Sequence, residues 1–259
     1  MSSRARKVVI TGGSGGIGRS VVARFLATGD RVVNLDRAPM EETAASERLL
    51  TVAVDLADPA SIATAFATAE AAFGGGPLDV LVCCAAISKA DPFLSVAAAD
   101  LDAMLAVNVR GTFLCGQEAG RRMRAAGRGH IVVVTSIAAA QAWAKESVYC
   151  LTKAAQASLV QSMAIELAPF GIHVNGVAPG IIDVRSKGMA GTRAGEILRH
   201  EMERFPLGRF GAPEEIAEAI EWLTRGTWMT GQTVTVDGGF MASGLTYFGE
   251  ARERLVSDA

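Results

Sequence analysis

The sequence predicts an α/β domain in which a doubly wound parallel sheet carries helices on both faces. Two observations lead to this prediction. Seven short runs of apolar and often β-branched residues recur along the chain, and helix-length segments separate most of them. Strands that read as nearly continuous apolar runs are typical of parallel sheets, which are buried on both faces. Alternation of such strands with helices favours right-handed crossovers and hence a doubly wound sheet.

The expected strands share this apolar character, and the expected helices lie between them. The strands are residues 7–11, 31–36, 49–55, 78–86, 130–136, 172–179 and 233–239. The helices are residues 17–28, 59–73, 101–125, 149–167 and 213–224. In a sheet of this kind, ligands bind beyond the carboxyl ends of the strands.

The composition fits one domain better than two. The chain has 259 residues, of which 50% are hydrophobic, and this is enough for a single sizeable core over residues 1–259. The formal net charge is -2 and no run of like charge is present, so no nucleic-acid partner is indicated. No apolar stretch approaches the ~18 residues that a membrane span needs, and we expect a cytoplasmic protein.

The cysteines and histidines give no sign of a metal site. The cysteines lie in apolar segments without Cys-x-x-Cys spacing, and the histidines are scattered. We therefore expect small buried side chains rather than disulfides, and no metal. The residues concerned are Cys83, Cys84, Cys115, Cys150, His130, His173 and His200.

A glycine-rich stretch, TGGSGGIG at residues 11–18, follows the first strand and opens the first helix. Glycines let the backbone approach a pyrophosphate closely, and a helix N-terminus offers free N–H groups to it. The stretch is therefore a candidate phosphate-binding turn. Its spacing alone allows three sets of working glycines, at positions 13, 15 and 18, at 12, 15 and 18, or at 12, 16 and 18.

An acidic residue at the end of the second strand strengthens this nucleotide interpretation. Asp36 stands where a carboxylate can accept hydrogen bonds from the adenosine ribose hydroxyls. A carboxylate there repels a 2′-phosphate, and Ser14 and Gly15 stand where a phosphate-binding base could have been. The predicted cofactor is therefore NAD rather than NADP.

Two neighbouring residues leave alternatives open. Arg37 is either a solvated charge or a side chain that can turn toward a 2′-phosphate. Asp55, at the end of the third strand, either bonds the adenine amino group or caps the helix that starts near Pro59.

Tyr149 and Lys153 stand four residues apart in the segment YCLTK and so share one face of the expected helix. A free tyrosine has a pKa of ~10 and is a poor base at neutral pH, but a nearby ammonium favours the phenolate. The pair is a candidate acid/base unit. Ser136 ends the fifth strand, where its hydroxyl can hold a substrate oxygen. Asn108, an unfavourable residue within a helix, is a candidate for fixing a proton-relay water.

Together these motifs resemble the short-chain dehydrogenase/reductase family, in the branch whose chains have about 250 residues. The resemblance spans nearly the whole chain. It rests on TGGSGGIG, Asp36, Asp55, Asn108, Ser136, Tyr149, Lys153, APG at residues 178–180 and VDGG at residues 236–239. It implies a Rossmann-like domain with a seven-stranded parallel sheet.

The resemblance also implies a role for each polar residue. Tyr149 is the general acid/base, Ser136 orients and polarises the carbonyl or alcohol, and Asn108 completes a proton relay. Lys153 lowers the pKa of Tyr149 and binds the nicotinamide ribose. The residues implied in cofactor binding are Thr11, Gly12, Ser14, Gly16, Ile17, Gly18, Asp36, Arg37, Asp55, Leu56, Ala85, Tyr149, Lys153, Pro179, Gly180 and Ile182.

The same resemblance selects among the glycine registers. It favours Gly12, Gly16 and Gly18 as the working set, with Thr11 fastening the turn and with Gly13 and Gly15 as permissive fillers. An extended sugar-nucleotide epimerase would use Gly15 but needs a larger C-terminal region than this chain has.

Two departures from the family pattern stand out. The stretch after the fourth strand reads Cys83, Cys84, Ala85 and Ala86 where the family has an Asn-Asn-Ala-Gly-like sequence, so a role for an asparagine amide is lost. Val184 replaces the threonine that contacts the nicotinamide amide in the family, with Arg185 or Ser186 as substitutes.

The long segment before the last helix is expected to be a substrate lid at about residues 184–209. Its apolar residues include Ile197, Leu198, Met202 and Phe205 on one side of a short helix. Apolar residues from this lid and from loops predict a substrate with an apolar part, although they can equally pack the lid against the body. They are Phe93, Leu94, Trp143, Met189, Met202 and Phe205.

The family resemblance further implies a homotetramer. Its interfaces would use the helices at residues 101–125 and 149–167 and the last strand and helix. A tail at residues 244–259 carries Leu245, Tyr247 and Phe248, which are costly to expose to water, and we expect it to meet a neighbouring subunit.

The leading functional hypothesis is an NAD-dependent oxidoreductase that moves hydride between a secondary alcohol or ketone and the nicotinamide, with alcohol oxidation as the expected direction. A 3-oxoacyl-thioester reductase or a sugar dehydrogenase would use the same four polar residues. A non-catalytic NAD-sensing scaffold is the alternative from another class, and the retention of all four residues argues against it.

Overall fold

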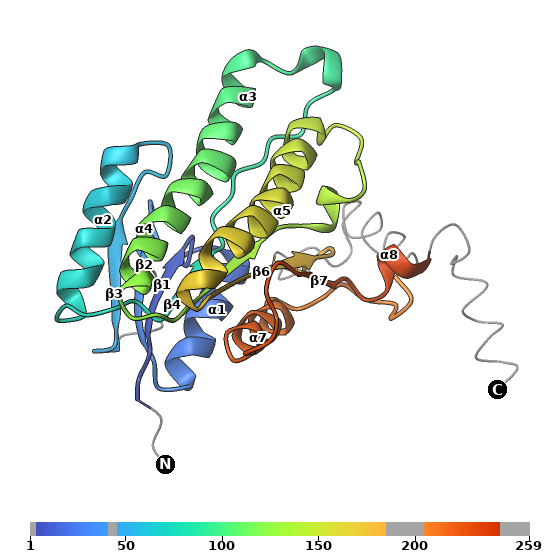
Figure 1. Ribbon diagram of the computed structural model, residues 1–259. Coiled ribbons are helices and arrows are strands. Elements are labelled where there is room, and N and C mark those ends of the chain that lie inside the picture. The colour runs from blue at the N-terminus through green and yellow to red at the C-terminus, as the bar shows by residue number, and fades with distance from the viewer. Residues whose placement is uncertain (1–3, 41–45, 185–204, 244–259) are drawn as a thin grey trace, which may run out of the picture.

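The computed structural model describes residues 4–40, 46–184 and 205–243 (Figure 1). Its centre is one parallel sheet with the strand order β3-β2-β1-β4-β5-β6-β7, which is the predicted doubly wound arrangement. The order reverses at β1 and β4, so a crevice opens there at the carboxyl ends of the strands. The strands are β1 (Lys7–Thr11), β2 (Arg31–Asp36), β3 (Leu49–Ala53), β4 (Val80–Cys83), β5 (Gly129–Val134), β6 (Ile172–Pro179) and β7 (Thr233–Val236).

Helices cover both faces of this sheet (Figure 1). Alternate strand residues point to opposite faces, so Val9 and Leu81 enter the core beneath α2, α4 and α5, while Val8 and Val80 enter the core beneath α1 and α7. The helices are α1 (Gly16–Ala27), α2 (Pro59–Ala72), α3 (Ala98–Met104), α4 (Thr112–Arg124), α5 (Ser147–Leu167), α7 (Pro213–Leu223) and α8 (Phe240–Ser243).

Several expected element boundaries are corrected by the structure. The segment 101–125 is not one α-helix, because the π-helical segment Leu105–Gly111 lies between α3 and α4. The strands expected at 49–55 and 78–86 are shorter, as β3 and β4. The strand expected at 233–239 ends at Val236, since Gly238 and Gly239 have positive φ values of 63° and 86° that an extended strand does not allow.

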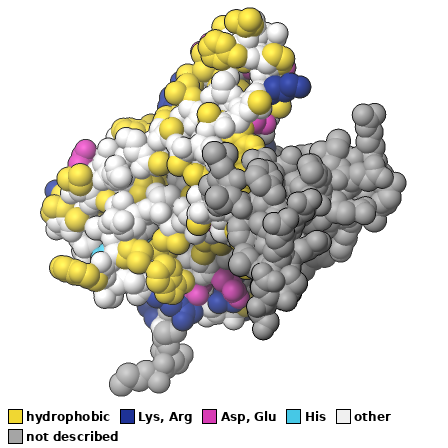
Figure 2. Space-filling model, turned by 90° about the vertical axis from the view of Figure 1, so that its right-hand side faces the viewer, with side chains coloured by type: hydrophobic (Ala, Val, Ile, Leu, Met, Phe, Trp, Pro, Cys, Tyr) yellow, Lys and Arg dark blue, Asp and Glu magenta, His cyan; other side chains and the backbone are white. Residues whose placement is uncertain are grey.

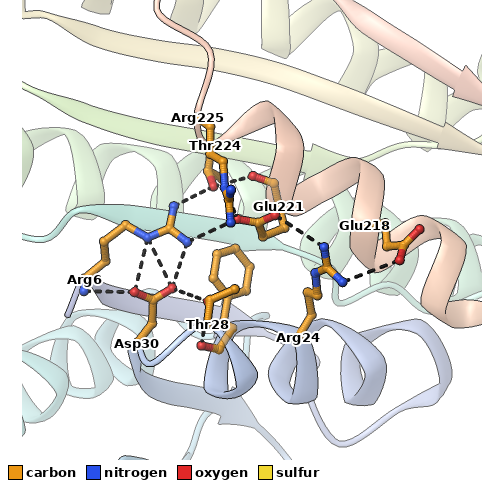
Figure 3. A network of polar contacts seen from close by, with 9 residues as sticks. Arg6, Arg24, Thr28, Asp30, Glu218, Glu221, Thr224 and Arg225 are labelled. Carbon is orange, nitrogen blue, oxygen red and sulfur yellow. Dashed lines mark hydrogen bonds and ion pairs between the residues drawn. The ribbon is translucent and has the colours of Figure 1, made fainter. Parts of the chain in front are cut away.

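A network of charged side chains ties the residue before β1 and the end of α1 to α7 (Figure 3). Asp30 is buried and pairs with Arg6, with Nη2 of the arginine 2.7 Å from Oδ2 of the aspartate. Burial alone would raise the pKa of Asp30, but hydrogen bonds from Arg6 and Thr28 outweigh it and hold this pKa below its usual value. Buried Glu221 of α7 also contacts Arg6, at 3.6 Å. The network therefore fixes α7 against the start of the sheet.

The remaining global predictions concern the membrane, metals, the lid and the tail. In the described ranges, no helix is both long and apolar enough to span a membrane, and no group of three or more potential ligand side chains could hold a metal ion. Most of the predicted lid, with Ile197, Leu198, Met189 and Met202, and the whole predicted tail lie outside the described residues.

Candidate active site

A cavity of about 580 Å³ lies along the carboxyl ends of the strands. Every residue predicted to bind the cofactor lines it, except Thr11. The lining residues are Gly12, Ser14, Gly15, Gly16, Ile17, Gly18, Leu35, Asp36, Arg37, Ala38, Val54, Asp55, Leu56, Cys84, Ala85, Ala86, Ile87, Val107, Val134, Thr135, Ser136, Tyr149, Lys153, Pro179, Gly180, Ile182 and Val184. Cavities of this size suit a small organic ligand.

The glycine-rich turn is held too tightly for side chains at the three positions selected from the sequence. A Cβ at Gly18 would lie 2.0 Å from the carbonyl oxygen of Gly12, and one at Gly16 would lie 2.6 Å from Val184 Cγ1. Gly12 itself has a φ of +75°. A Cβ at Gly15 would find its nearest neighbour at 3.7 Å, so Gly15 is permissive as expected.

Gly13 is not a permissive filler, and this part of the prediction was wrong. A Cβ at Gly13 would lie 2.5 Å from Asn34 Oδ1 and 2.8 Å from Val22 Cγ2. Asn34, fully buried in β2, accepts a hydrogen bond from the Gly13 N–H at 2.8 Å and donates to the Ser14 hydroxyl at 3.0 Å. Sequence reasoning missed Asn34, although a polar residue inside a buried strand was the available signal.

Asp36 holds the other side of this turn. Its carboxylate accepts the N–H of Ser14 at 3.0 Å through Oδ2 and the N–H of Ala38 at 3.0 Å through Oδ1. Arg37, next to it, is exposed and also lines the cavity. Thr11 lies behind the turn, where its hydroxyl accepts the Ala85 N–H at 3.3 Å and so links the ends of β1 and β4.

Of the two alternatives for Asp55, the structure rules out the helix cap. Asp58 is the residue that caps α2, since its side chain accepts the N–H of Ala60 at 2.9 Å. Asp55 Oδ1 accepts the N–H of Ala57 at 3.0 Å, and Asp55 lines the cavity together with Leu56.

Ser136, Tyr149 and Lys153 meet in the same cavity. Ser136 begins a short 3-10 turn after β5, Ile137–Ala139, and its hydroxyl accepts the Ala138 N–H at 3.1 Å. Tyr149 and Lys153 lie one turn apart on α5, and the Lys153 ammonium is 5.5 Å from the centroid of the tyrosine ring. A hydroxyl, a phenol and an ammonium therefore line the same part of the chain's cavity.

The pKa of Tyr149 is raised, whereas the family resemblance implies that Lys153 lowers it. Burial raises the pKa of Tyr149 above its usual value, and the hydrogen bond with Ser136 lowers it by a smaller amount. Burial also lowers the pKa of Lys153 to about 8. Burial is therefore the largest influence on the pKa of Tyr149, and Tyr149 is a protonated phenol at neutral pH in this arrangement.

Asn108 lies behind the cavity wall, in the π-helical segment, and is fully buried. Its side chain accepts the Ile87 N–H at 2.8 Å and donates to the Ile87 carbonyl at 2.9 Å. It also donates to the Thr152 hydroxyl at 3.1 Å. Asn108 therefore joins the segment after β4 to α5, and π-helical turns of this kind are frequent at functional sites.

The apolar residues predicted for a substrate pocket have different positions. Phe93 and Leu94 are 77% and 96% exposed and do not line the described cavity, so their contact with a substrate stays a prediction. They belong to the short 3-10 turn Phe93–Ser95 before α3. Figure 2 shows hydrophobic side chains gathered on the projecting end of the molecule. Phe205 is buried and forms an aromatic cluster with Trp143 and Phe240 beside the turn after Ser136, with Trp143 and Phe240 stacked at 5.6 Å.

The departures from the family pattern fall at the cavity wall. Cys84, Ala85 and Ala86 line the cavity, while Cys83 is buried in the core. Burial raises the pKa of Cys84 to about 12, so this thiol stays neutral. Val184 lines the cavity together with Gly16 and is 49% exposed. Arg185 and Ser186, which were suggested to replace the family's threonine, lie outside the described residues.

Comparison with known proteins gives matches over almost the whole chain. A family model described as enoyl-(acyl carrier protein) reductase matches residues 12–241. L-Xylulose reductase from Bos taurus is 37% identical over 245 residues, covering 92% of this chain and 97% of the relative. L-2,3-Butanediol dehydrogenase from Corynebacterium glutamicum is 34% identical over 257 residues, covering 92% and 99%.

Solved structures agree with these matches. ElxO with NADP bound superposes with a TM-score of 0.84 at 28% identity, covering 92% of this chain and 100% of that one. A short-chain type dehydrogenase/reductase from Mycobacterium marinum superposes with a TM-score of 0.81 at 29% identity, covering 91% and 95%.

Proposed function

This chain belongs to the short-chain dehydrogenase/reductase family, and from that premise we propose that it is an NAD-dependent oxidoreductase that interconverts secondary alcohols and ketones. The observation that carries this proposal is the convergence of Ser136, Tyr149 and Lys153 in one cavity with the glycine-rich turn. The similarity to an L-xylulose reductase and to an L-2,3-butanediol dehydrogenase supports an alcohol or a ketone as the substrate.

The residues of the cavity fit a dinucleotide. The close approach of Gly18 to the Gly12 carbonyl brings bare backbone and the N-terminus of α1 to the cavity, which suits a pyrophosphate. Asp36 would hold the adenosine ribose, and the segment of Pro179, Gly180 and Ile182 would meet the nicotinamide. When bound, the nicotinamide supplies the acceptor or donor of the hydride.

The chain's own residues handle the proton. In ketone reduction, Tyr149 Oη donates its proton to the carbonyl oxygen as the carbon is reduced, while the Ser136 hydroxyl donates a hydrogen bond to the same oxygen and polarises it. In alcohol oxidation, the phenolate of Tyr149 accepts the hydroxyl proton. The Lys153 ammonium stabilises this phenolate by its positive charge and orients the cofactor ribose. Asn108 would keep α5 in place.

We infer NAD rather than NADP from Asp36. Two backbone N–H groups fix its carboxylate at the cavity edge, where a 2′-phosphate would meet a negative charge. The structural neighbour ElxO was solved with NADP bound, so the proposal of NAD depends on the Asp36 carboxylate and not on the similar proteins. We expect wild-type protein to bind NADH more tightly than NADPH, and Asp36→Ala to reduce this preference about tenfold. Wild-type protein that prefers NADPH would contradict the proposal.

The catalytic proposal is tested by Tyr149→Phe. We expect this variant to lose turnover by at least about a thousandfold, because it lacks the proton donor, and to bind NADH nearly as well as the wild type. The assay is nicotinamide absorbance with a panel of diols, sugars, cyclic alcohols and hydroxyacyl thioesters. Full activity in Tyr149→Phe would disprove the role of Tyr149, and intact NADH binding excludes misfolding as the cause of a loss.

A polyol or sugar dehydrogenase is the second candidate, favoured by the 37% identity to an L-xylulose reductase. Turnover of ketoses in preference to simple ketones would support it. The single domain, the homotetramer, the cytoplasmic location and the apolar part of the substrate stay predictions.

A further inference from the structure

The side chain of Gln156 lies directly behind the lysine of the candidate site. Both residues are on the buried face of α5, with Gln156 0% and Lys153 2% exposed. The amide oxygen of Gln156 accepts a hydrogen bond from Lys153 Nζ at 2.9 Å. Lys153 Nζ also donates to the Val134 carbonyl at 2.9 Å. An ammonium has three N–H donors, so one is left for the cavity that Lys153 lines.

Hydrogen bonds on its far side fix the orientation of this amide. Gln156 Nε2 donates to the Asn108 carbonyl at 2.8 Å and to the Thr112 hydroxyl oxygen at 2.9 Å. The Thr112 hydroxyl donates its own proton to the same Asn108 carbonyl at 2.7 Å, so it acts as an acceptor toward Gln156. A flipped amide would set its NH₂ group against the Lys153 ammonium. The Gln156 oxygen therefore points to Lys153.

The other groups that face this ammonium do not replace such an acceptor. Tyr149 faces it from the same helix, and the thiols of Cys83 and Cys84 face it from the end of β4. Burial raises the pKa of both thiols, so both stay neutral at physiological pH. Within the described residues, Gln156 is the side chain that gives the Lys153 ammonium a hydrogen-bond acceptor.

We infer that Gln156 is the positioning residue of Lys153, and that its amide takes the place of the relay water expected between Lys153 and Asn108. This inference rests on the proposed function, in which Lys153 assists Tyr149. An amide accepts at oxygen and donates at nitrogen, but it does not carry a proton from one to the other in its stable form. Lys153 therefore acts on Tyr149 through its positive charge and exchanges protons only on the cavity side.

Titration of Lys153 by NMR, with lysine carbon-labelled at Cε, tests this inference without an activity assay. The Lys153 signal is assigned with Lys153→Arg. Gln156→Met keeps the length of the side chain but removes the acceptor, so we expect the pKa of Lys153 to fall by about one unit. Gln156→Glu offers a carboxylate instead and should raise this pKa by about one unit. Gln161→Met makes the same change at an exposed position of α5 and is the matched control, expected to cause no shift.

An unchanged Lys153 pKa in folded Gln156→Met, or an equal fall in Gln161→Met, would overturn the inference. Where Gln156→Met does not fold, Gln156→Glu decides, because an unchanged or lowered Lys153 pKa in that variant contradicts the inference as directly.

The pH profile of turnover then separates this inference from the proposed function. In Gln156→Met, Lys153 loses its charge at a lower pH and stabilises the Tyr149 phenolate less. The rise of kcat for alcohol oxidation should therefore move to higher pH. We expect kcat to fall about tenfold, with little change in the KM for the alcohol. A wild type without nicotinamide-linked turnover refutes the proposed function, and the NMR titration still decides the role of Gln156. An active wild type whose Gln156→Met profile and Lys153 pKa are both unshifted refutes the inference alone.

Discussion

Alanine at Gly18 should damage the glycine-rich turn far more than alanine at Gly15. A Cβ at Gly18 would lie 2.0 Å from the Gly12 carbonyl oxygen and 2.8 Å from its carbonyl carbon. Ordinary contacts need about 3.5 Å, so two backbone segments would have to part by roughly 1 Å or more. At Gly15 the nearest atom is at 3.7 Å, and no movement is needed.

The expected magnitude follows from this geometry. Overpacking of a tight site costs about 1–3 kcal/mol, and the displaced Gly12 carbonyl also loses its hydrogen bond from the Gly15 N–H, which is 3.3 Å long. Because each ~1.4 kcal/mol is a factor of ten, NADH affinity should fall about 10- to 100-fold in Gly18→Ala. In Gly15→Ala the change should stay below about threefold.

Fluorescence titration with NADH measures both affinities, and circular dichroism checks that each variant is folded. Equal loss of affinity in the two variants would refute the reasoning, because it would mean that the site depends on glycine content and not on the close approach of Gly18 to Gly12.

Two further predictions concern pH. Burial raises the pKa of Tyr149, so kcat for ketone reduction should be highest at neutral or lower pH and kcat for alcohol oxidation should rise toward alkaline pH; oxidation that is fastest at acidic pH would contradict this. Asp30→Asn breaks a buried ion pair with Arg6 and should lower the free energy of unfolding by about 3 kcal/mol at neutral pH. The pKa of Asp30 is lowered in the folded state, so its stabilisation is present above the unfolded pKa of about 4 and is lost as pH falls below it. Urea unfolding at neutral and acidic pH should therefore show a difference between wild type and variant that shrinks on acidification, and a constant difference would contradict the assignment.

The parts of the fold that the sequence predicted well depend on local residue patterns. The continuous apolar runs at Lys7–Thr11, Arg31–Asp36 and Ile172–Pro179 became strands with the expected limits, because each is buried on both faces. The π-helical segment Leu105–Gly111 was not predictable, since a change from α- to π-helix alters no composition or period that a short sequence reveals.

In the candidate site, too, some residues could be predicted from the sequence and others could not. The residues Asp36, Tyr149 and Lys153 could be found from their spacing and from the expected strands and helices, whereas glycines 12, 16 and 18 were selected by the family resemblance, because their spacing alone left three registers open. The constraint on Gly13 comes from Asn34, which is distant in the sequence, and only the folded chain brings them together. Gln156 was missed because a polar residue on a helix is read as exposed until the helix face is known to be buried.

Hydride transfer itself is the most direct test of the proposed function. A panel of secondary alcohols labelled with deuterium at the carbinol carbon is incubated with NAD and either wild-type protein or Tyr149→Phe, and the reduced nicotinamide is analysed by mass spectrometry. We predict deuterium in the nicotinamide with the wild type and at least about a thousandfold less with Tyr149→Phe, which still binds the cofactor. Absence of label transfer by the wild type across the panel, or equal transfer by both proteins, would contradict the proposed function.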